Sequence, residues 1–192
     1  MTDFFQCKEY VVRESVGFTN LHESYDIWDA EEKARLASAT EEADLALKIQ
    51  KLFLDKAFLP ALVKVHDVAG RLLLELEQPR SLIVSSLIAR DAEGKTLGTF
   101  RQNLFSYGGA LEVTGPDGLP LGTISGDWKC RQYTFADTGG KALATIDHLY
   151  GGLARELLTT ADDYRVRILG DQSLAPLVLA GTLAVDLVFH EV

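Results

Sequence analysis

Cysteine is scarce in this chain, where Cys7 and Cys130 are the only two among 192 residues and form no C-x-x-C pair. Such scarcity is typical of a reducing cytosol, although a single Cys7–Cys130 disulfide stays open. The first residues, Met1 to Glu9, also lack a basic stretch followed by an apolar core, so we expect no secretory signal. These shortages predict a cytoplasmic protein.

Basic residues are outnumbered, with 19 Lys and Arg against 28 Asp and Glu and a formal net charge of −9. Nucleic acid binding needs a basic footprint, so we expect no nucleic acid partner. Binding to an anionic membrane would need local basic clusters. With 47% apolar and 24% charged residues, the composition is that of one globular domain over residues 1–192.

Catalytic motifs are missing as well. The four histidines, at positions 22, 66, 148 and 190, have no zinc-binding spacing, and no G-x-S-x-G motif occurs. The glycine pairs never extend into a phosphate-binding loop. The sequence predicts a non-enzymatic protein without a cofactor; only a Ser/His/Asp set assembled from distant segments stays open.

A turn motif recurs five times between short alternating arms. Its turn contains Asp and usually Gly, then in most copies a basic or small residue, and the turn glycines Gly70, Gly94, Gly118 and Gly140 lie 24, 24 and 22 residues apart. In the fourth copy, Leu111 to Leu119, Asp117 stands directly before Gly118. The first copy, Tyr25 to Lys33, has Glu in place of Gly. Asp accepts hydrogen bonds from nearby amides, and Gly adopts positive φ without a steric clash. The spacing predicts consecutive β-hairpins.

One apolar segment follows the hairpins. Twelve of the sixteen residues in 174–189 are apolar, and as a helix they would span about 24 Å, less than the ~30 Å of a bilayer core. About twelve strands would close into a barrel too wide for its own side chains to fill. We therefore predict a mainly β protein, a closed antiparallel barrel around a core helix at 174–189.

Two details of this fold stay open in the sequence. Residues 29–54 are rich in helix-forming residues, but the repeat favours a strand at 34–40 and a short helix at 42–50. Asp186 lies within the apolar helix, and a buried carboxylate is costly without a partner. We expect an inward Arg, Lys or Tyr beside Asp186, or a position at the barrel mouth near water.

Several short segments resemble one family. They are residues 10–16, 25–29, 58–65, 94–100, 126–128, 155–164 and 179–189. Together they are similar to the phospholipid scramblase and LURP-one-related family, which has the Tubby C-terminal-like fold. The resemblance implies a barrel of twelve strands around a hydrophobic C-terminal helix, in agreement with the strand count.

The resemblance also implies a calcium-binding segment before the final helix. The matching acidic residues are Asp162, Asp163 and Asp171. Thr160 replaces an expected acidic residue, and Arg165 and Arg167 add positive charge where Ca²⁺ would bind. We favour a polar turn before a strand over a calcium site here.

Some Tubby-like barrels bind phosphoinositide headgroups through surface Lys and Arg. The basic residues that could do so here are Lys48, Lys51, Lys56, Lys64, Lys129 and Arg131. The resemblance implies a binding module for lipid headgroups or a protein partner, cytoplasmic or peripheral to a membrane. Its alternative is phospholipid scrambling with the C-terminal helix in the bilayer.

Overall fold

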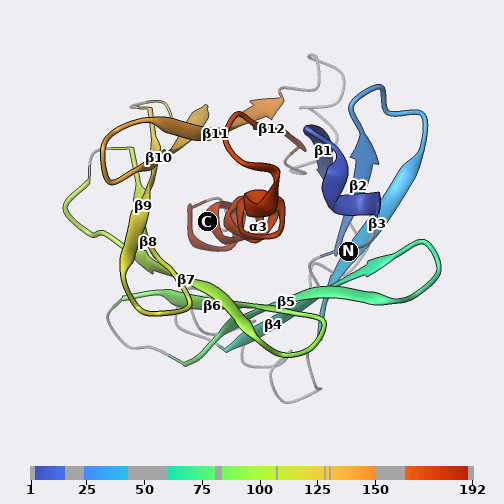
Figure 1. Cartoon of the computed structure of the whole chain (residues 1–192), viewed down its shortest axis with the longest axis horizontal. Helices are drawn as coiled ribbons and strands as arrows, with labels where there is room; N and C mark the ends of the chain where they lie inside the picture. The colour runs from blue at the N-terminus through green and yellow to red at the C-terminus, as the bar shows by residue number, and fades with distance from the viewer. Residues whose placement is uncertain are drawn as a thin grey trace.

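The computed structural model describes residues 3–15, 24–42, 60–80, 84–106, 108–127, 129, 131–149 and 163–189. In these ranges twelve strands form one closed barrel around helix α3 (Ala175–Phe189) (Figure 1). The strands are β1 (Glu9–Glu14), β2 (Ser24–Asp29), β3 (Arg35–Glu41), β4 (Ala61–Asp67), β5 (Leu72–Gln78), β6 (Ser86–Asp91), β7 (Thr96–Gln102), β8 (Ala110–Thr114), β9 (Pro120–Gly126), β10 (Gln132–Asp137), β11 (Ala142–Leu149) and β12 (Asp163–Ile168). Short 3-10 turns, η1 (Asp3–Gln6) and η3 (Gln172–Leu174), precede β1 and α3. The predicted fold class is confirmed.

The strands follow one another around the ring in sequence order. Each pairs antiparallel with its chain neighbours, and β1 closes the barrel against β12 with Tyr10 opposite Val166. Closure leaves no unpaired sheet edge, which would otherwise invite association with other chains. The strand predicted at 34–40 is confirmed as β3, whereas the helix predicted at 42–50 lies, from residue 43 onward, outside the described residues.

The repeated motif forms the tight turns of five hairpins. In the turn between β4 and β5, Oδ1 of Asp67 accepts hydrogen bonds from the amides of Ala69 and Arg71, both at 2.9 Å. Gly70 has φ of +79° and donates its amide to the carbonyl of Asp67 at 2.9 Å. Gly94, Gly118 and Gly140 also have positive φ, so the predicted hairpin turns are confirmed.

Side chains alternate between the core and the outer surface. In β4, Val63 and Val65 point into the core, and in β12 Tyr164, Val166 and Ile168 do the same. The core also receives α3, whose residues from Leu177 to Leu187 are all buried. The core helix predicted at 174–189 is therefore confirmed, with Leu174 in η3 instead of the α-helix.

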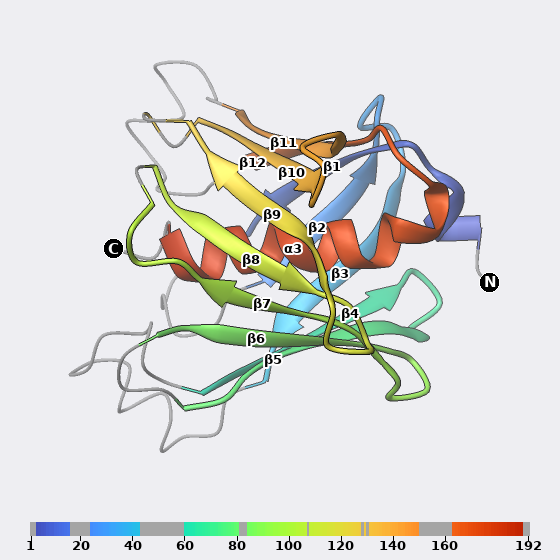
Figure 2. The same cartoon turned by 60° about the vertical axis from the view of Figure 1, so that its left-hand side comes forward.

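The two ends of the barrel differ in their connections (Figure 2). The turn end carries the five tight hairpin turns together with η1, η3 and the first residue of α3. At this end Nε2 of Gln172 donates to the carbonyls of Phe5 and Cys7, at 3.0 and 2.7 Å. The loop end carries the longer connections and the last residue of α3, Phe189. The helix thus runs through the barrel from the turn end to the loop end.

Candidate functional site

The six basic residues predicted to bind headgroups do not gather in one patch as far as the described residues show. Lys48, Lys51 and Lys56 lie outside the described residues. Lys64 lies in β4, whereas Lys129 and Arg131 lie in the connection between β9 and β10. Strands β5 to β8 separate the two places around the ring.

Lys64 is held between two carboxylates on the outer face of the barrel. Its Nζ lies 3.0 Å from Glu42 Oε2 and 3.7 Å from Glu75 Oε1. The hydrogen bond to Glu42, supported by the charges of Glu42 and Glu75, raises the pKa of Lys64. Its positive charge is therefore neutralised locally, which weakens any attraction for a phosphate.

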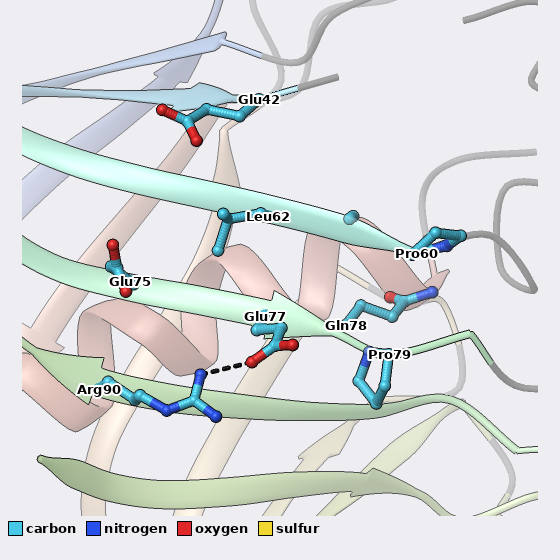
Figure 3. Close-up of a pocket in the computed structure, with 9 residues that line it drawn as sticks. Glu42, Pro60, Leu62, Glu75, Glu77, Gln78, Pro79 and Arg90 are labelled. Carbon is cyan, nitrogen blue, oxygen red and sulfur yellow. Dashed lines mark hydrogen bonds and ion pairs between the residues drawn. The ribbon is translucent and has the colours of Figure 1, made fainter. Parts of the chain in front are cut away.

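Beside Lys64 a pocket of about 340 Å³ opens on the surface of β4, β5 and β6 (Figure 3). Among the described residues that line it are Glu42, Glu75 and Glu77, together with one basic residue, Arg90. Arg90 Nη1 lies 2.5 Å from Glu77 Oε2, as the dashed line in Figure 3 marks. An acidic lining with a paired arginine disfavours an anionic headgroup.

The calcium candidates that the structure describes lie at opposite ends of β12. Asp163, the first residue of the strand, is buried 3.5 Å from Nε of Arg13. Asp171 caps η3 through a 2.8 Å hydrogen bond from the amide of Ser173, which lowers the pKa of Asp171. Five residue steps of β12 span about 17 Å. Asp162 lies outside the described residues, among which no group of three potential metal ligands occurs.

Asp186 is buried in the barrel and hydrogen-bonded to two tyrosines. Tyr25 from β2 donates to Oδ2 at 2.5 Å, and Tyr164 from β12 donates to Oδ1 at 2.6 Å. The His148 ring packs edge-on against Tyr164 with ring centroids 5.4 Å apart. Of the partners that the sequence left open for Asp186, the structure selects tyrosine. The arrangement connects α3 to the barrel wall, and Asp186 as a whole residue is 4% exposed.

Arginines on the outer face of β1 and β12 are also paired. Glu32, in the first hairpin turn, accepts from Arg13 and lies 3.7 Å from Nη2 of Arg165. Arg165 lies 2.8 Å from Glu9, and Arg167 lies 3.5 Å from the same carboxylate. Glu32 has φ of +58°, the conformation that Gly adopts in the other hairpin turns. These arginines serve to clamp the closing strand pair rather than to present an open basic surface.

Among the described residues of the loop end, the most exposed large apolar side chains belong to a turn between β7 and β8. Leu104 is 53% exposed and Phe105 is 99% exposed. Asn103 fixes the turn, since its Oδ1 accepts the amide of Phe105 at 3.0 Å and its Nδ2 donates to Glu112 at 3.2 Å. Sequence analysis missed this pair; its only signal is Leu-Phe between Asn103 and Ser106, where a turn is otherwise polar.

This turn adjoins the connection that carries Lys129 and Arg131. The amide of Gly126 donates to the carbonyl of Gly109 at 2.9 Å, and the backbone of Gly108 passes so close to Asp127 that a Cβ there would lie 2.3 Å from its carbonyl oxygen. Lys129 and Arg131 are both exposed. The connection with two exposed apolar side chains therefore adjoins the connection with two exposed basic side chains.

Comparison with known proteins identifies relatives at the level of family and fold. The model of the family described as Scramblase matches residues 16–192. A protein from Arabidopsis thaliana, solved by X-ray crystallography, superimposes with a TM-score of 0.51 and 12% sequence identity over 93% of this chain and 91% of that chain. At that identity the likeness supports the fold alone. No curated protein sequence matches this chain.

Proposed function

Because the chain belongs to the scramblase family, we propose that it is a non-enzymatic, cytoplasmic binding module that attaches peripherally to an anionic membrane. Helix α3 stays inside the barrel in this proposal. The family suggests an association with membrane lipids. The observation that carries the peripheral mode is the burial of α3 together with the hydrogen bonds of Asp186 to Tyr25 and Tyr164.

Moving α3 into a bilayer would carry two costs. The barrel would lose the side chains that fill its interior, exposing large core residues such as Phe100, Leu111 and Ile124. Asp186 would also lose its hydrogen bonds to Tyr25 and Tyr164, and a carboxylate within an apolar membrane span is costly. Both costs favour a protein that meets the membrane as a folded barrel.

Phospholipid scrambling with α3 in the bilayer is the alternative, and one observation supports it. The 18-residue segment Gln172–Phe189 is apolar and long enough to cross a membrane by length and composition. A buried core helix has the same properties, and 67% of this segment is buried within the barrel. We therefore place the peripheral mode first.

Flotation with liposomes distinguishes these functions. Purified protein is mixed with neutral or anionic vesicles, with and without Ca²⁺, and then with increasing NaCl. We expect flotation with anionic vesicles only, reversed by salt because screening weakens attraction between charges. Flotation that resists salt, together with lipid exchange between leaflets in reconstituted vesicles, would support the scrambling alternative. Absence of flotation under every condition would overturn membrane binding and point to a protein partner.

Hydrogen exchange of α3 provides a second readout. A helix retained in the barrel keeps the amide protection of the protein core when vesicles are added. We expect the same exchange rates for residues 177–187 with and without anionic vesicles. Loss of protection across the barrel strands on vesicle binding would contradict a helix that stays enclosed.

A further inference from the structure

We propose that the turn Asn103–Ser106, called here the β7–β8 tip, is the element that inserts into the membrane. This inference rests on the proposed function and names the surface that performs it. The tip would place Leu104 and Phe105 in the interfacial region of an anionic bilayer. Lys129 and Arg131 beside it would contact the lipid phosphates.

Folding of the barrel does not require apolar side chains at the tip. Phe105 is 99% exposed and buries almost none of its ring in the barrel, so it contributes little to the hydrophobic core. The turn itself is organised by polar contacts: Asn103 donates its amide to Ala110 at 2.8 Å and accepts the amide of Phe105 at 3.0 Å. A polar side chain at position 105 would leave these hydrogen bonds of the turn unchanged.

Contacts behind the tip hold it in a defined position. Gly109 has φ of +81°, and a Cβ there would lie 2.9 Å from the ring of Phe189 at the end of α3. The Phe189 ring stacks on Tyr133 with centroids 5.9 Å apart. Figure 2 shows this connection between β7 and β8 beside the C-terminal end of α3. The connection is thus packed against the end of α3 at its base, while Leu104 and Phe105 remain exposed.

The charges around the tip suit an anionic surface. Lys129 and Arg131 are exposed in the adjoining connection, and Arg101 is exposed at the end of β7. Among the described carboxylates of these two connections, Asp127 accepts the amide of Arg131 at 2.6 Å, and Glu112 in β8 accepts from Asn103 at 3.2 Å. In a chain of net charge −9, apolar and basic exposed side chains meet here. An interfacial membrane anchor has this combination of apolar and cationic groups.

The test compares tip variants with matched variants at the turn end. We expect Leu104→Ser/Phe105→Ser to lower the partition coefficient on phosphatidylserine-containing vesicles at least tenfold, because two apolar side chains no longer leave water. Lys129→Gln/Arg131→Gln should lower it about 25-fold, about fivefold for each lost charge. The controls are Val68→Ser/Leu119→Ser and Lys95→Gln/Lys141→Gln, which change exposed residues at the turn end.

Each outcome bears on one of the two proposals. Loss of vesicle binding by the tip variants but not by the controls, with unchanged urea midpoints, supports the tip. If the original chain floats and the tip variants float equally well, the inference that the tip inserts into the membrane is wrong, whereas the proposed function is unaffected. If the original chain does not float at all, the proposed function fails first. A dimer in sedimentation that Phe105→Ser converts to a monomer would make the tip a self-association surface and overturn the inference.

Discussion

The hydroxyl of Tyr164 lies 2.6 Å from Oδ1 of Asp186, and so joins the last strand of the barrel to the helix inside it. Tyr25 makes the matching contact from β2 to Oδ2 at 2.5 Å. Strands β2 and β12 flank β1, so the two tyrosines hold the helix on both sides of the strand that closes the ring.

Replacing Asp186 should destabilise the barrel through its tyrosines. We expect Asp186→Leu to lower the free energy of unfolding by about 2–5 kcal/mol, because two buried hydroxyls lose an acceptor. Tyr25→Phe and Tyr164→Phe should each cost about 1–3 kcal/mol. The triple variant, which combines these three substitutions and leaves no unpaired hydroxyl at the site, should recover part of the loss in urea unfolding. A triple variant less stable than Asp186→Leu alone would contradict this coupling.

A charge in the centre of α3 should prevent folding. Leu183 is buried among the core side chains. We expect Leu183→Asp to lose the cooperative thermal transition, because an unpaired carboxylate in the core costs more than about 4 kcal/mol. Leu183→Ala should remain folded and lose about 2–5 kcal/mol. Leu169→Asp, at an exposed site, is the matched control, and native melting of Leu183→Asp would show that this face of α3 is not in the core.

Gly181 should resist substitution because of its neighbours in the barrel. A Cβ at this position would lie 2.6 Å from Cδ1 of Ile124 and 3.1 Å from the ring of Phe100. Gly181→Ala gains about 1 kcal/mol of helix propensity but overpacks the core at about 1–3 kcal/mol. We expect a net loss of about 1 kcal/mol in chemical unfolding.

The Ile124→Val background tests that explanation, because it removes the nearest methyl group. Ile124→Val itself should cost about 1 kcal/mol. Adding Gly181→Ala in this background should then be neutral or stabilising. An equal loss in both backgrounds would show that Ile124 does not limit the residue at position 181.

The carboxylate of Asp67 in a hairpin turn should make the free energy of unfolding depend on pH in the acid range. Amide hydrogen bonds, led by that from Arg71, lower the pKa of Asp67 below its ordinary value of 3.8. A lowered pKa in the folded state contributes stability that is present above pH 3.8 and is lost as pH falls through the folded value. We expect Asp67→Asn to be less stable than the original chain at pH 7, with the difference shrinking toward pH 2. A difference independent of pH in urea titrations would rule out this charge effect.

Much of the fold could be predicted because its signals are local. Asp and Gly at the repeated turns indicate the hairpins, and alternating residues such as Val63 and Val65 mark the buried face. The first hairpin is informative, since Glu32 adopts the glycine conformation without being glycine. Its carboxylate contacts Arg13 and Arg165, which come from strands far apart in sequence.

The candidate site was harder to predict because it depends on which connections between strands lie next to each other at the loop end of the barrel. Lys129 and Arg131 were identified as basic residues, but their separation from Lys64 around the ring follows from strand order. The exposure of Leu104 and Phe105 could not be read from composition, since the same residues pack into a core in many proteins.

The hairpins, their approximate number and the apolar helix can be predicted from the amino-acid sequence, because turn chemistry and the alternation of side chains act over a few residues. The need to fill a wide barrel also placed the helix inside it. The contacts of Asp186 with Tyr25 and Tyr164, and the proximity of the β7–β8 connection to the β9–β10 connection, follow from the tertiary structure. Those contacts join residues distant in the chain, and closure of the barrel, not local preference, brings them together.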